Sequence, residues 1–425
     1  MSSALLIIEK NEQILSLLYQ ENRMIQVKVH ENNGKKQVNM AGEDKLSSLP
    51  LHAIYIGKVK NVVPSIDAAF VEVEKGKKGF LPMKQAKNPI IVNRKYDGRI
   101  VAGDEILVQI EKEGIKTKDP GLTCNLSFTG KYCVLTTGKQ SVGFSTKLDN
   151  QTKLYWKQQL EEWNMDEILA EENIGLVVRT NVTALMEDGI DPQSDIAKTS
   201  DVCIGSSKFR EEFQQLLEQK NKVLSAVSYR TCFSCLDQPM EGYLEDIRDA
   251  YEDSFDKIVT NNEVFYRRIR ETFPTMENVE LYQDTRIPLE KLYSVETRLK
   301  EALDERVWLK SGAYLVIQQT EALTVIDVNS GKIQKKNPKD DIYFEINKEA
   351  AGEIALQMKL RNLSGIIIID FINQNTKEQD KELLAYLSGL VKKDSIKTNV
   401  VDMTPLGLVE VTRKKIHKSL REQLK

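Results

Sequence analysis

The chain has 425 residues, of which 41% are hydrophobic and 29% are charged, and its net charge is −3 at pH 7. This profile excludes a disordered chain and predicts about two to four compact units, and the near-neutral charge means that any nucleic-acid contact depends on local basic patches. No apolar run reaches the ~18 residues of a membrane span, no signal peptide precedes the first strand, and five cysteines are a sparse, odd set, so we expect a cytoplasmic protein.

The N-terminal quarter is predicted to consist of short β-strands. Apolar residues cluster at 4–8 and 25–29, as in a small hairpin, and the polar stretch 31–49 predicts a loop or a domain boundary. Between residues 51 and 112 follow IYIGKVKNVVP, AAFVEVE, GFLP and EILVQIEKE, with glycine or proline between them. This spacing predicts a five-stranded barrel of the OB type.

The middle of the chain alternates between strands and helices. Strands are expected at 130–136 and 175–180, with a helix over 152–164 between them. Residues 207–224 predict an amphipathic helix, because Phe209, Phe213, Leu217 and Val223 recur on one side. KIVTN and VELYQ then predict strands, and VFYRRIRETF and VETRLKEALDERVWLK predict helices.

The last third has the most regular pattern. ALTVIDV and GIIIIDFI are apolar enough to be buried strands. Between them, residues 341–361 predict a helix with Ile346, Ala350, Ile354 and Met358 on one stripe. A strand–helix–strand unit of this length implies parallel strands joined by a right-handed crossover.

Two carboxylates end these two strands. Asp327 follows ALTVI and Asp370 follows GIIII, so parallel strands place both at the same carboxyl edge, where ligands of open sheets collect. Two close carboxylates repel each other unless a cation lies between them, and oxygen ligands without histidine or cysteine suit Mg²⁺ or Mn²⁺. Asn329 shares the face of Asp327. An alternative from spacing alone is turn capping, because Asn329, Ser330 and Gly331 are typical turn residues.

Three long motifs carry a resemblance to a known family. QTEALTVIDVNSGK, RNLSGIIIIDFI and MTPLGLVEVTRKK, in this order, resemble the catalytic blocks of the ribonuclease E/G family. The resemblance implies that Asp327 and Asp370 hold one Mg²⁺ ion and that Asn329 positions the scissile phosphate or a water molecule. It further implies an endoribonuclease that hydrolyses single-stranded RNA to 5′-phosphate and 3′-hydroxyl ends. The sequence departs from the family at Asn373, where an acid is frequent.

The barrel segment IYIGKVKNVVPSIDAAFVEVEKGKKGFLPMK resembles the S1-type RNA-binding domain of the same family. The resemblance places Phe70 and Phe80 at base-stacking positions and Lys118 and Lys397 at basic RNA contacts. Stacked bases on aromatic rings, with lysines along the backbone, are typical of single-strand binding. Without the resemblance, the two phenylalanines would be assigned to the core of a small barrel.

A second RNA site is implied by GLVVRT and TGKYCV. These segments match the family's pocket for a 5′-monophosphate, at Gly130, Val134, Arg179 and Thr180. An arginine fork and a hydroxyl suit a phosphate dianion. Taken alone, Arg179 would be interpreted as a surface ion-pair partner.

Two further features, a basic run and a cysteine pair, do not by themselves indicate a functional site. The basic run from Arg413 to Arg421 predicts a helix with a solvated face or an RNA-backbone contact. Cys232 and Cys235 form a lone CxxC, which we interpret as thiols. The family's structural zinc uses a CxxC after the catalytic part, and this sequence ends at Lys425, so we expect neither a structural zinc nor a zinc-linked oligomer.

The resemblance implies an α+β, multi-subdomain fold. An RNase H-like part (1–48 and 223–300) would hold an inserted S1-type OB barrel (49–125) and a 5′-sensor region (126–222), and a DNase I-like catalytic part (301–425) would follow. The expected substrates are AU-rich single-stranded regions of mRNA or rRNA precursors, with RNA-decay proteins as partners. Two alternatives stay open: a non-catalytic RNA-binding protein of this fold, and a metal phosphoesterase for small nucleotides.

Overall fold

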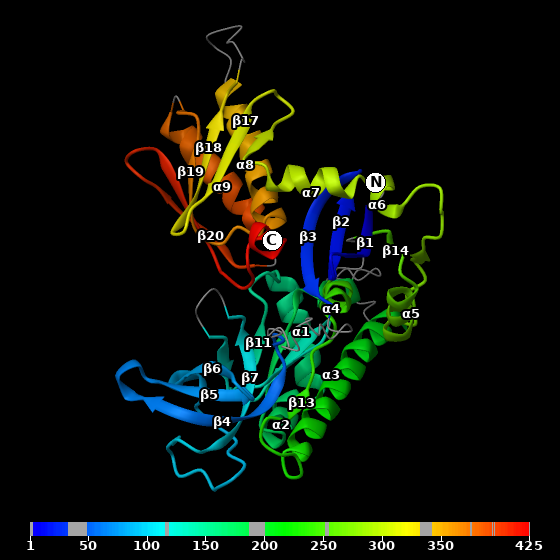
Figure 1. Ribbon diagram of the computed structural model, residues 1–425, viewed down its shortest axis with the longest axis vertical. Coiled ribbons are helices and arrows are strands. Elements are labelled where there is room, and N and C mark those ends of the chain that lie inside the picture. The colour runs from blue at the N-terminus through cyan, green and yellow to red at the C-terminus, as the bar shows by residue number, and fades with distance from the viewer. Residues whose placement is uncertain are drawn as a thin grey trace, which may run out of the picture. The chain divides into compact units, whose positions relative to one another are not determined.

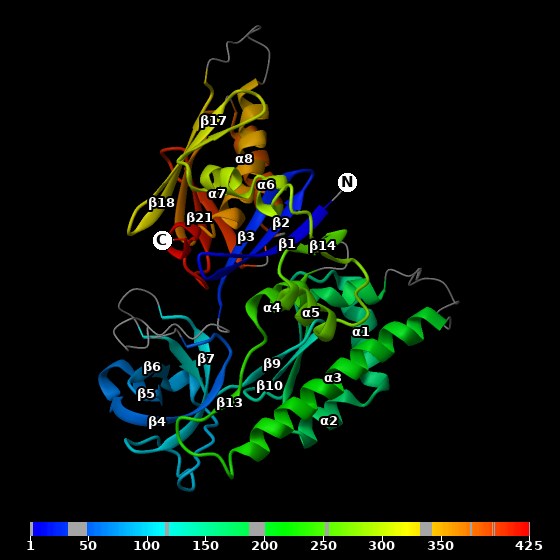
Figure 2. The same ribbon diagram turned by 45° about the vertical axis from the view of Figure 1, so that its right-hand side comes forward.

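A computed structural model describes residues 3–32, 49–114, 119–186, 200–250, 255–331, 342–374, 376–392, 394 and 396–424. The chain divides into two compact units, one formed by Met1–Lys36 with Asp253–Lys425 and the other by Gln37–Glu252. Both mix helices and sheets, which confirms the α+β class, and the first unit is discontinuous in sequence (Figures 1 and 2).

The first unit contains a five-stranded sheet in the order β15-β14-β1-β2-β3. Its strands are β1 (Ser3–Lys10), β2 (Gln13–Gln20), β3 (Arg23–Glu31), β14 (Lys257–Thr260) and β15 (Val279–Leu281). The predicted hairpin of residues 4–8 with 25–29 is wrong, because QILSLLYQ forms β2 between the two strands. Helices α5 (Glu263–Thr272), α6 (Leu289–Leu292) and α7 (Val295–Leu303) follow β14 and β15, and α6 and α7 pack on this sheet.

The same unit holds a six-stranded sheet in the order β16-β17-β18-β19-β21-β20. The strands are β16 (Arg306–Trp308), β17 (Tyr314–Gln319), β18 (Leu323–Asn329), β19 (Gly365–Asp370), β20 (Thr398–Met403) and β21 (Leu408–Arg413). Strands β18 and β19 are parallel, as predicted. Helices α8 (Ile342–Leu360) and α9 (Lys377–Val391) pack on one face, where Ile326, Ile367 and Ile369 are fully buried (Figure 1).

Two helix predictions in this unit are partly wrong. Helix α7 ends at Leu303, and Asp304 is extended, because RVW pairs with β17 as strand β16. The basic run after residue 413 is not one helix: Arg413 ends β21, and only Leu420–Gln423 form the short helix α10. Arg413 is buried, and its Nε donates a hydrogen bond to Asp394 Oδ2 at 2.7 Å, which neutralises its charge.

The second unit contains the predicted five-stranded barrel. Strands β4, β5, β6, β8 and β7 pair in that order, and β7 pairs back with β4, so the barrel is closed. The strands are β4 (Ile54–Val63), β5 (Ala68–Glu74), β6 (Lys77–Pro82), β7 (Glu105–Lys112) and β8 (Gly121–Thr123), with short 3-10 turns at Pro64–Ile66 and Met83–Gln85. Strand β13 (Cys235–Asp237) extends the sheet beside β4.

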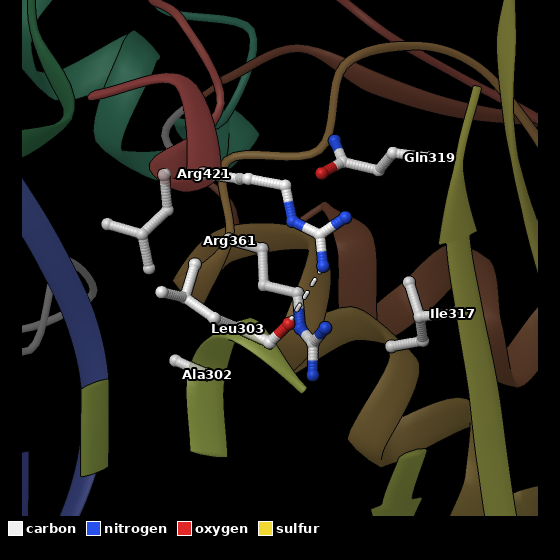
Figure 3. A pocket seen from close by; sticks show the side chains of 7 residues that line it. Ala302, Leu303, Ile317, Gln319, Arg361 and Arg421 are labelled. Atoms are coloured by element: carbon white, nitrogen blue, oxygen red, sulfur yellow. Dashed lines mark hydrogen bonds between the residues drawn. The ribbon is translucent and has the colours of Figure 1, made fainter. Parts of the chain in front are cut away.

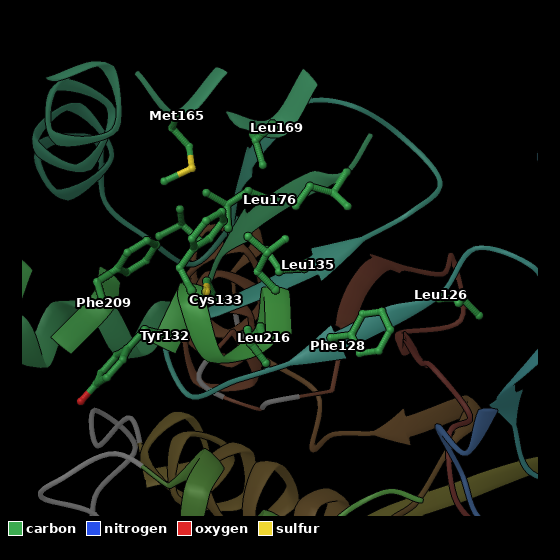
Figure 4. Packing of buried hydrophobic residues seen from close by; sticks show 14 of the residues in the cluster. Leu126, Phe128, Tyr132, Cys133, Leu135, Met165, Leu169, Leu176, Phe209 and Leu216 are labelled. Carbon is green, nitrogen blue, oxygen red and sulfur yellow. The ribbon is translucent and has the colours of Figure 1, made fainter. Parts of the chain in front are cut away.

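The segment that follows the barrel in the sequence forms a four-stranded sheet in the order β11-β12-β10-β9. It comprises β9 (Ser127–Thr129), β10 (Cys133–Thr136), β11 (Val142–Phe144) and β12 (Gly175–Val178). Helices α1 (Asn150–Glu162), α2 (Met165–Glu171) and α3 (Ser200–Ala226) accompany it, and a 3-10 turn (Thr180–Leu185) and α4 (Gly242–Asp249) complete the unit. The side chains of α3 predicted to share one face, Phe209 among them, are buried against Leu135 and Leu176 (Figure 4).

Across the described ranges, no helix combines the length and the apolar character that a membrane span requires.

Candidate functional site

The two aspartates at the ends of β18 and β19 are direct partners. In the parallel register, Leu323 pairs with Ile366 at the start, and Asp327 pairs with Asp370 at the end. Paired residues on neighbouring strands point to the same face, and the strands are about 4.8 Å apart. The structure therefore brings both carboxylates together, as the strand–helix–strand pattern predicts.

The face that carries them is opposite to the packed helices. Ile326 and Val328 alternate with Asp327 and lie in the core against α8 and α9. Asp327 is half-buried and Asp370 is exposed. The alternation of strand side chains thus uses one face for stability and leaves the other for polar groups.

Asn329 belongs to the same cluster, since its Nδ2 donates a hydrogen bond to Asp327 Oδ2 at 2.6 Å. This bond uses one oxygen of the Asp327 carboxylate and orients the group. Neither aspartate forms an ion pair with a cationic side chain of the described residues. Two carboxylates without a countercharge fit a divalent cation such as Mg²⁺, which binds one or two carboxylates and keeps several waters.

No group of three or more His, Cys, Asp or Glu side chains able to hold a metal ion occurs among the described residues. Within the described ranges, Asp327 and Asp370 are thus the acidic side chains at this edge that could hold a cation, and such a cation stays a prediction.

The barrel places Phe70 and Phe80 directly opposite each other on β5 and β6. Their ring centroids are 5.8 Å apart with an interplanar angle of 65°. Both rings are half-buried, and neither belongs to the barrel core, which is formed by Ala69, Val71 and Leu81 among others. The alternative that they belong to the core is therefore not supported, and their role in RNA stacking stays a prediction.

The predicted lysine contacts are less defined. Lys118 lies outside the described residues. Lys397 is exposed and immediately precedes β20, and its carbonyl accepts a hydrogen bond from the Lys414 N–H at 3.0 Å. The residue itself lies beside the edge strand β20 of the six-stranded sheet, and an RNA contact there stays a prediction.

The four residues of the predicted 5′-sensor converge on one end of the four-stranded sheet. Arg179 Nη1 donates to the Gly130 carbonyl, and the Arg179 N–H donates to the Tyr132 carbonyl at 2.8 Å. Val134 pairs with Val177, and Arg179 lies two residues after Val177. The side chains of Val134 and Arg179 therefore lie on the same face of the sheet. Thr180 follows Arg179 directly and begins the 3-10 turn.

Two carboxylates that sequence reasoning missed occupy this region. Asp249 Oδ1 accepts from Arg179 Nη1 at 2.9 Å and from Arg248 Nε at 2.9 Å. Burial raises the pKa of Asp249, but the two arginines outweigh it and leave the pKa below its ordinary value. Arg179 is therefore already paired with an ionised carboxylate through its Nη1.

The second carboxylate belongs to Glu212 on α3. It accepts hydrogen bonds from the successive backbone N–H groups of Lys131, Tyr132 and Cys133, the last two at 2.7 and 3.0 Å. Successive N–H groups form an anion-binding nest, and here the chain fills it with its own side chain. The nest is thus a fixed structural contact beside Gly130.

A pocket elsewhere in the first unit is lined by Arg361, Arg421 and Gln319 (Figure 3). Arg361 Nη1 donates to the Asp304 carbonyl at 2.6 Å, and Arg421 Nη2 donates to the Leu303 carbonyl at 3.1 Å. Burial, followed by the nearby Arg421, lowers the pKa of Arg361 to about 10, so it remains a cation at neutral pH. Gln319 is the last residue of β17, whereas Asn329 pairs with Tyr314, the first residue of that strand. The pocket and the aspartates therefore lie toward opposite ends of β17.

Comparisons with known proteins agree with the motifs. Residues 127–416 match the ribonuclease E/G family. The chain belongs to the ribonuclease E/G family. Ribonuclease G of Salmonella typhimurium (strain SL1344) is 30% identical over 388 residues, which cover 87% of this chain and 74% of that protein. Ribonuclease E of Synechocystis sp. is 30% identical over 380 residues, covering 87% of this chain and 53% of that protein. Ribonuclease G of Haemophilus influenzae is 29% identical over 385 residues, with 87% and 74% covered.

Membership of the ribonuclease E/G family confirms the resemblance that the three sequence motifs indicated. The matched region contains the aspartate pair, Asn329 and Arg179, whereas the barrel precedes it. The roles of the individual residues, and the RNase H-like and DNase I-like subdomain boundaries, stay predictions.

Proposed function

We propose that this endoribonuclease of the ribonuclease E/G family cuts single-stranded RNA by metal-dependent hydrolysis centred on Asp327, Asn329 and Asp370. The observation that carries the proposal is the register of β18 and β19, which pairs the two aspartates on the face opposite to α8 and α9. A side-by-side pair of carboxylates without a cationic partner among the described residues supports the proposal, because such a pair suits a divalent cation.

The chemistry divides between the cation and the side chains. A bound Mg²⁺ supplies Lewis-acid polarisation of a phosphoryl oxygen and a lowered pKa for attacking water. Asp327 and Asp370 hold the positive charge against the sheet edge. Asn329 keeps Asp327 oriented through its 2.6 Å hydrogen bond, and its amide oxygen is suited to orient a water molecule. In-line displacement then yields 5′-phosphate and 3′-hydroxyl ends.

The second unit supplies the RNA contacts in this proposal. The ring pair Phe70–Phe80 lies outside the barrel core, which suits it to stacking of unpaired bases. Arg179, beside Gly130, binds a 5′-monophosphate in competition with Asp249. We propose mRNA and rRNA precursors as substrates, AU-rich single-stranded regions as cleavage sites and the cytoplasm as the location.

A non-catalytic RNA-binding protein of the same fold is the second candidate. Loss of either aspartate would have favoured it, but Asp327, Asn329 and Asp370 are all present and clustered. A phosphoesterase for small nucleotides would not need an aromatic pair outside the barrel core, so the pair Phe70–Phe80 argues against that alternative.

Cleavage of a 5′-monophosphorylated, AU-rich single-stranded RNA tests the proposal. Activity with Mg²⁺, its loss with EDTA, its recovery with Mn²⁺ and 5′-phosphate product ends are the expected results. RNA that is bound and left intact at every Mg²⁺ and Mn²⁺ concentration would support the non-catalytic candidate instead.

A further inference from the structure

Strands β16 and β17 carry an exposed aromatic pair, Trp308 and Tyr314, which we call the aromatic platform. Their ring centroids are 5.1 Å apart with an interplanar angle of 55°. The Arg306 guanidinium lies 4.6 Å from the Tyr314 ring centroid and 5.8 Å from that of Trp308. Trp308 is 63% exposed, although tryptophan is one of the most costly side chains to leave in water.

The strand register places the aromatic platform on the face of the aspartate pair. Trp308 pairs with Tyr314, and Tyr314 pairs with Asn329. Directly paired residues point to the same side of a sheet, and each strand step is about 4.8 Å. Tyr314 is therefore one strand from Asn329, and Trp308 is two strands, or about 10 Å, from β18.

The burial pattern confirms this assignment independently of the register. Leu315 and Ile317 alternate with Tyr314 on β17 and lie in the core, and Val307 packs against the same core from β16. Trp308 and Tyr314 consequently point away from α8 and α9. They contribute little to the core of this unit, so stability does not account for an exposed tryptophan.

We propose that the aromatic platform binds an unpaired nucleobase of the substrate RNA close to the phosphate held at Asp327 and Asp370. The inference rests on the proposed function, because it uses the aspartate pair to identify the occupant. Bases of any identity stack on an aromatic face. A base in a duplex is already stacked on both sides, so the aromatic platform selects single-stranded RNA at the cleavage site itself.

Arg306 acts as a positioning residue in this arrangement. Its guanidinium lies over both rings, which holds them in one geometry by cation–π attraction. It also places a positive charge beside the bound base, where the RNA backbone is negative. Both effects favour a nucleic acid over an uncharged apolar partner.

Binding measurements on the full chain test the proposal without cleavage. The Asp370→Asn background, titrated with a fluorescein-labelled single-stranded RNA in Mg²⁺, provides the reference affinity. Adding Trp308→Ala should weaken binding by about 5- to 150-fold, the range expected for one stacked base. Trp308→Phe should retain most of the RNA affinity because it keeps an aromatic ring. Leu292→Ala, at an exposed apolar residue of α6, should leave the affinity unchanged.

A scan with abasic oligonucleotides tests the proposal on protein with an intact aromatic platform. Removing one base near the cleavage site should weaken binding, and the same removal should have no effect in Trp308→Ala. Affinity that depends equally on that base in both proteins would overturn the proposal. Self-association that is lost in Trp308→Ala, with RNA binding unchanged, would overturn it too and would assign the surface to a second copy of the chain.

The outcomes separate this inference from the proposed function. If the wild type cleaves RNA and Trp308→Ala cleaves with the same kcat/KM, only the aromatic platform fails. If the wild type binds RNA through Trp308 but never cleaves it, the proposed function fails and base binding stands.

Discussion

Asp327 and Asp370 are register partners on two parallel strands, so the backbone pairing of β18 and β19 places their Cα atoms side by side. Each follows a residue with no exposed surface, Ile326 and Ile369. The two carboxylates are thus held by a buried sheet rather than by a flexible loop, which suits a site that must keep one geometry through a reaction.

Asn329→Ala should lower the rate of RNA cleavage by roughly 10- to 100-fold, the usual effect of removing a group that orients a metal ligand. The reason is loss of the 2.6 Å hydrogen bond to Asp327 Oδ2. Single-turnover cleavage and RNA affinity should be measured together. An unchanged cleavage rate, or a loss explained by affinity alone, would remove Asn329 from the site.

Phe70→Ala and Phe80→Ala should each weaken single-stranded RNA binding by about 1–3 kcal/mol. Both rings lie outside the barrel core, so the melting temperature should change little. Tyr96→Ala is the matched control, because Tyr96 is an exposed aromatic residue of the same unit. If both variants bind RNA like the control, the rings are not a stacking site.

A 5′-monophosphate should accelerate cleavage relative to a 5′-triphosphate, and Arg179→Ala should remove the difference. Asp249→Asn should increase it, because the variant weakens the carboxylate that competes for Arg179. The ratio of the two cleavage rates is the quantity to compare, with Arg230→Ala as an exposed arginine control. A ratio that is the same in all four proteins would refute the sensor assignment.

The barrel should lose stability in acid through Asp104. Burial raises the pKa of Asp104, but hydrogen bonds from Arg94 and from the Val101 N–H outweigh it and leave the pKa below its ordinary value. The resulting stabilisation is complete above the unfolded pKa of about 3.9 and is lost as pH falls through the lower folded pKa.

Asp104→Asn should therefore reduce the free energy of unfolding by about 1.5–3 kcal/mol at pH 7 and by clearly less at pH 3. Urea titrations at the two pH values measure this difference. Asp97→Asn is the control, because Asp97 bonds the same arginine at 3.2 Å but is exposed, so its loss should be small. An equal reduction at both pH values for Asp104→Asn would contradict the ionic explanation.

The sequence predicted the parts of the fold that depend on local pattern. The apolar runs ending at Asp327 and Asp370, with a long amphipathic helix between them, allowed only a parallel pair with both acids at one edge. The spacing of glycine and proline around the short strands likewise predicted the closed barrel.

Contacts that depend on tertiary pairing were not predictable in the same way. RVW continues a helical pattern in the sequence, but pairing with β17 makes it a strand, and only that pairing places Trp308 on the face of the aspartates. Asp249 and Glu212 lie 70 and 81 residues from their partners Arg179 and Lys131. No local signal connects positions so far apart.

The most direct test of the account is the single-turnover cleavage rate of Asp370→Asn beside that of Glu410→Gln. Glu410 is an acid of the neighbouring strand β21, paired with Ile368 and thus on the same face of the sheet. With saturating RNA and Mg²⁺, we expect Asp370→Asn to lose more than the roughly 100-fold typical of an outer-shell change, while Glu410→Gln stays near the wild type. Cleavage by Asp370→Asn at the wild-type rate would contradict the aspartate-pair mechanism.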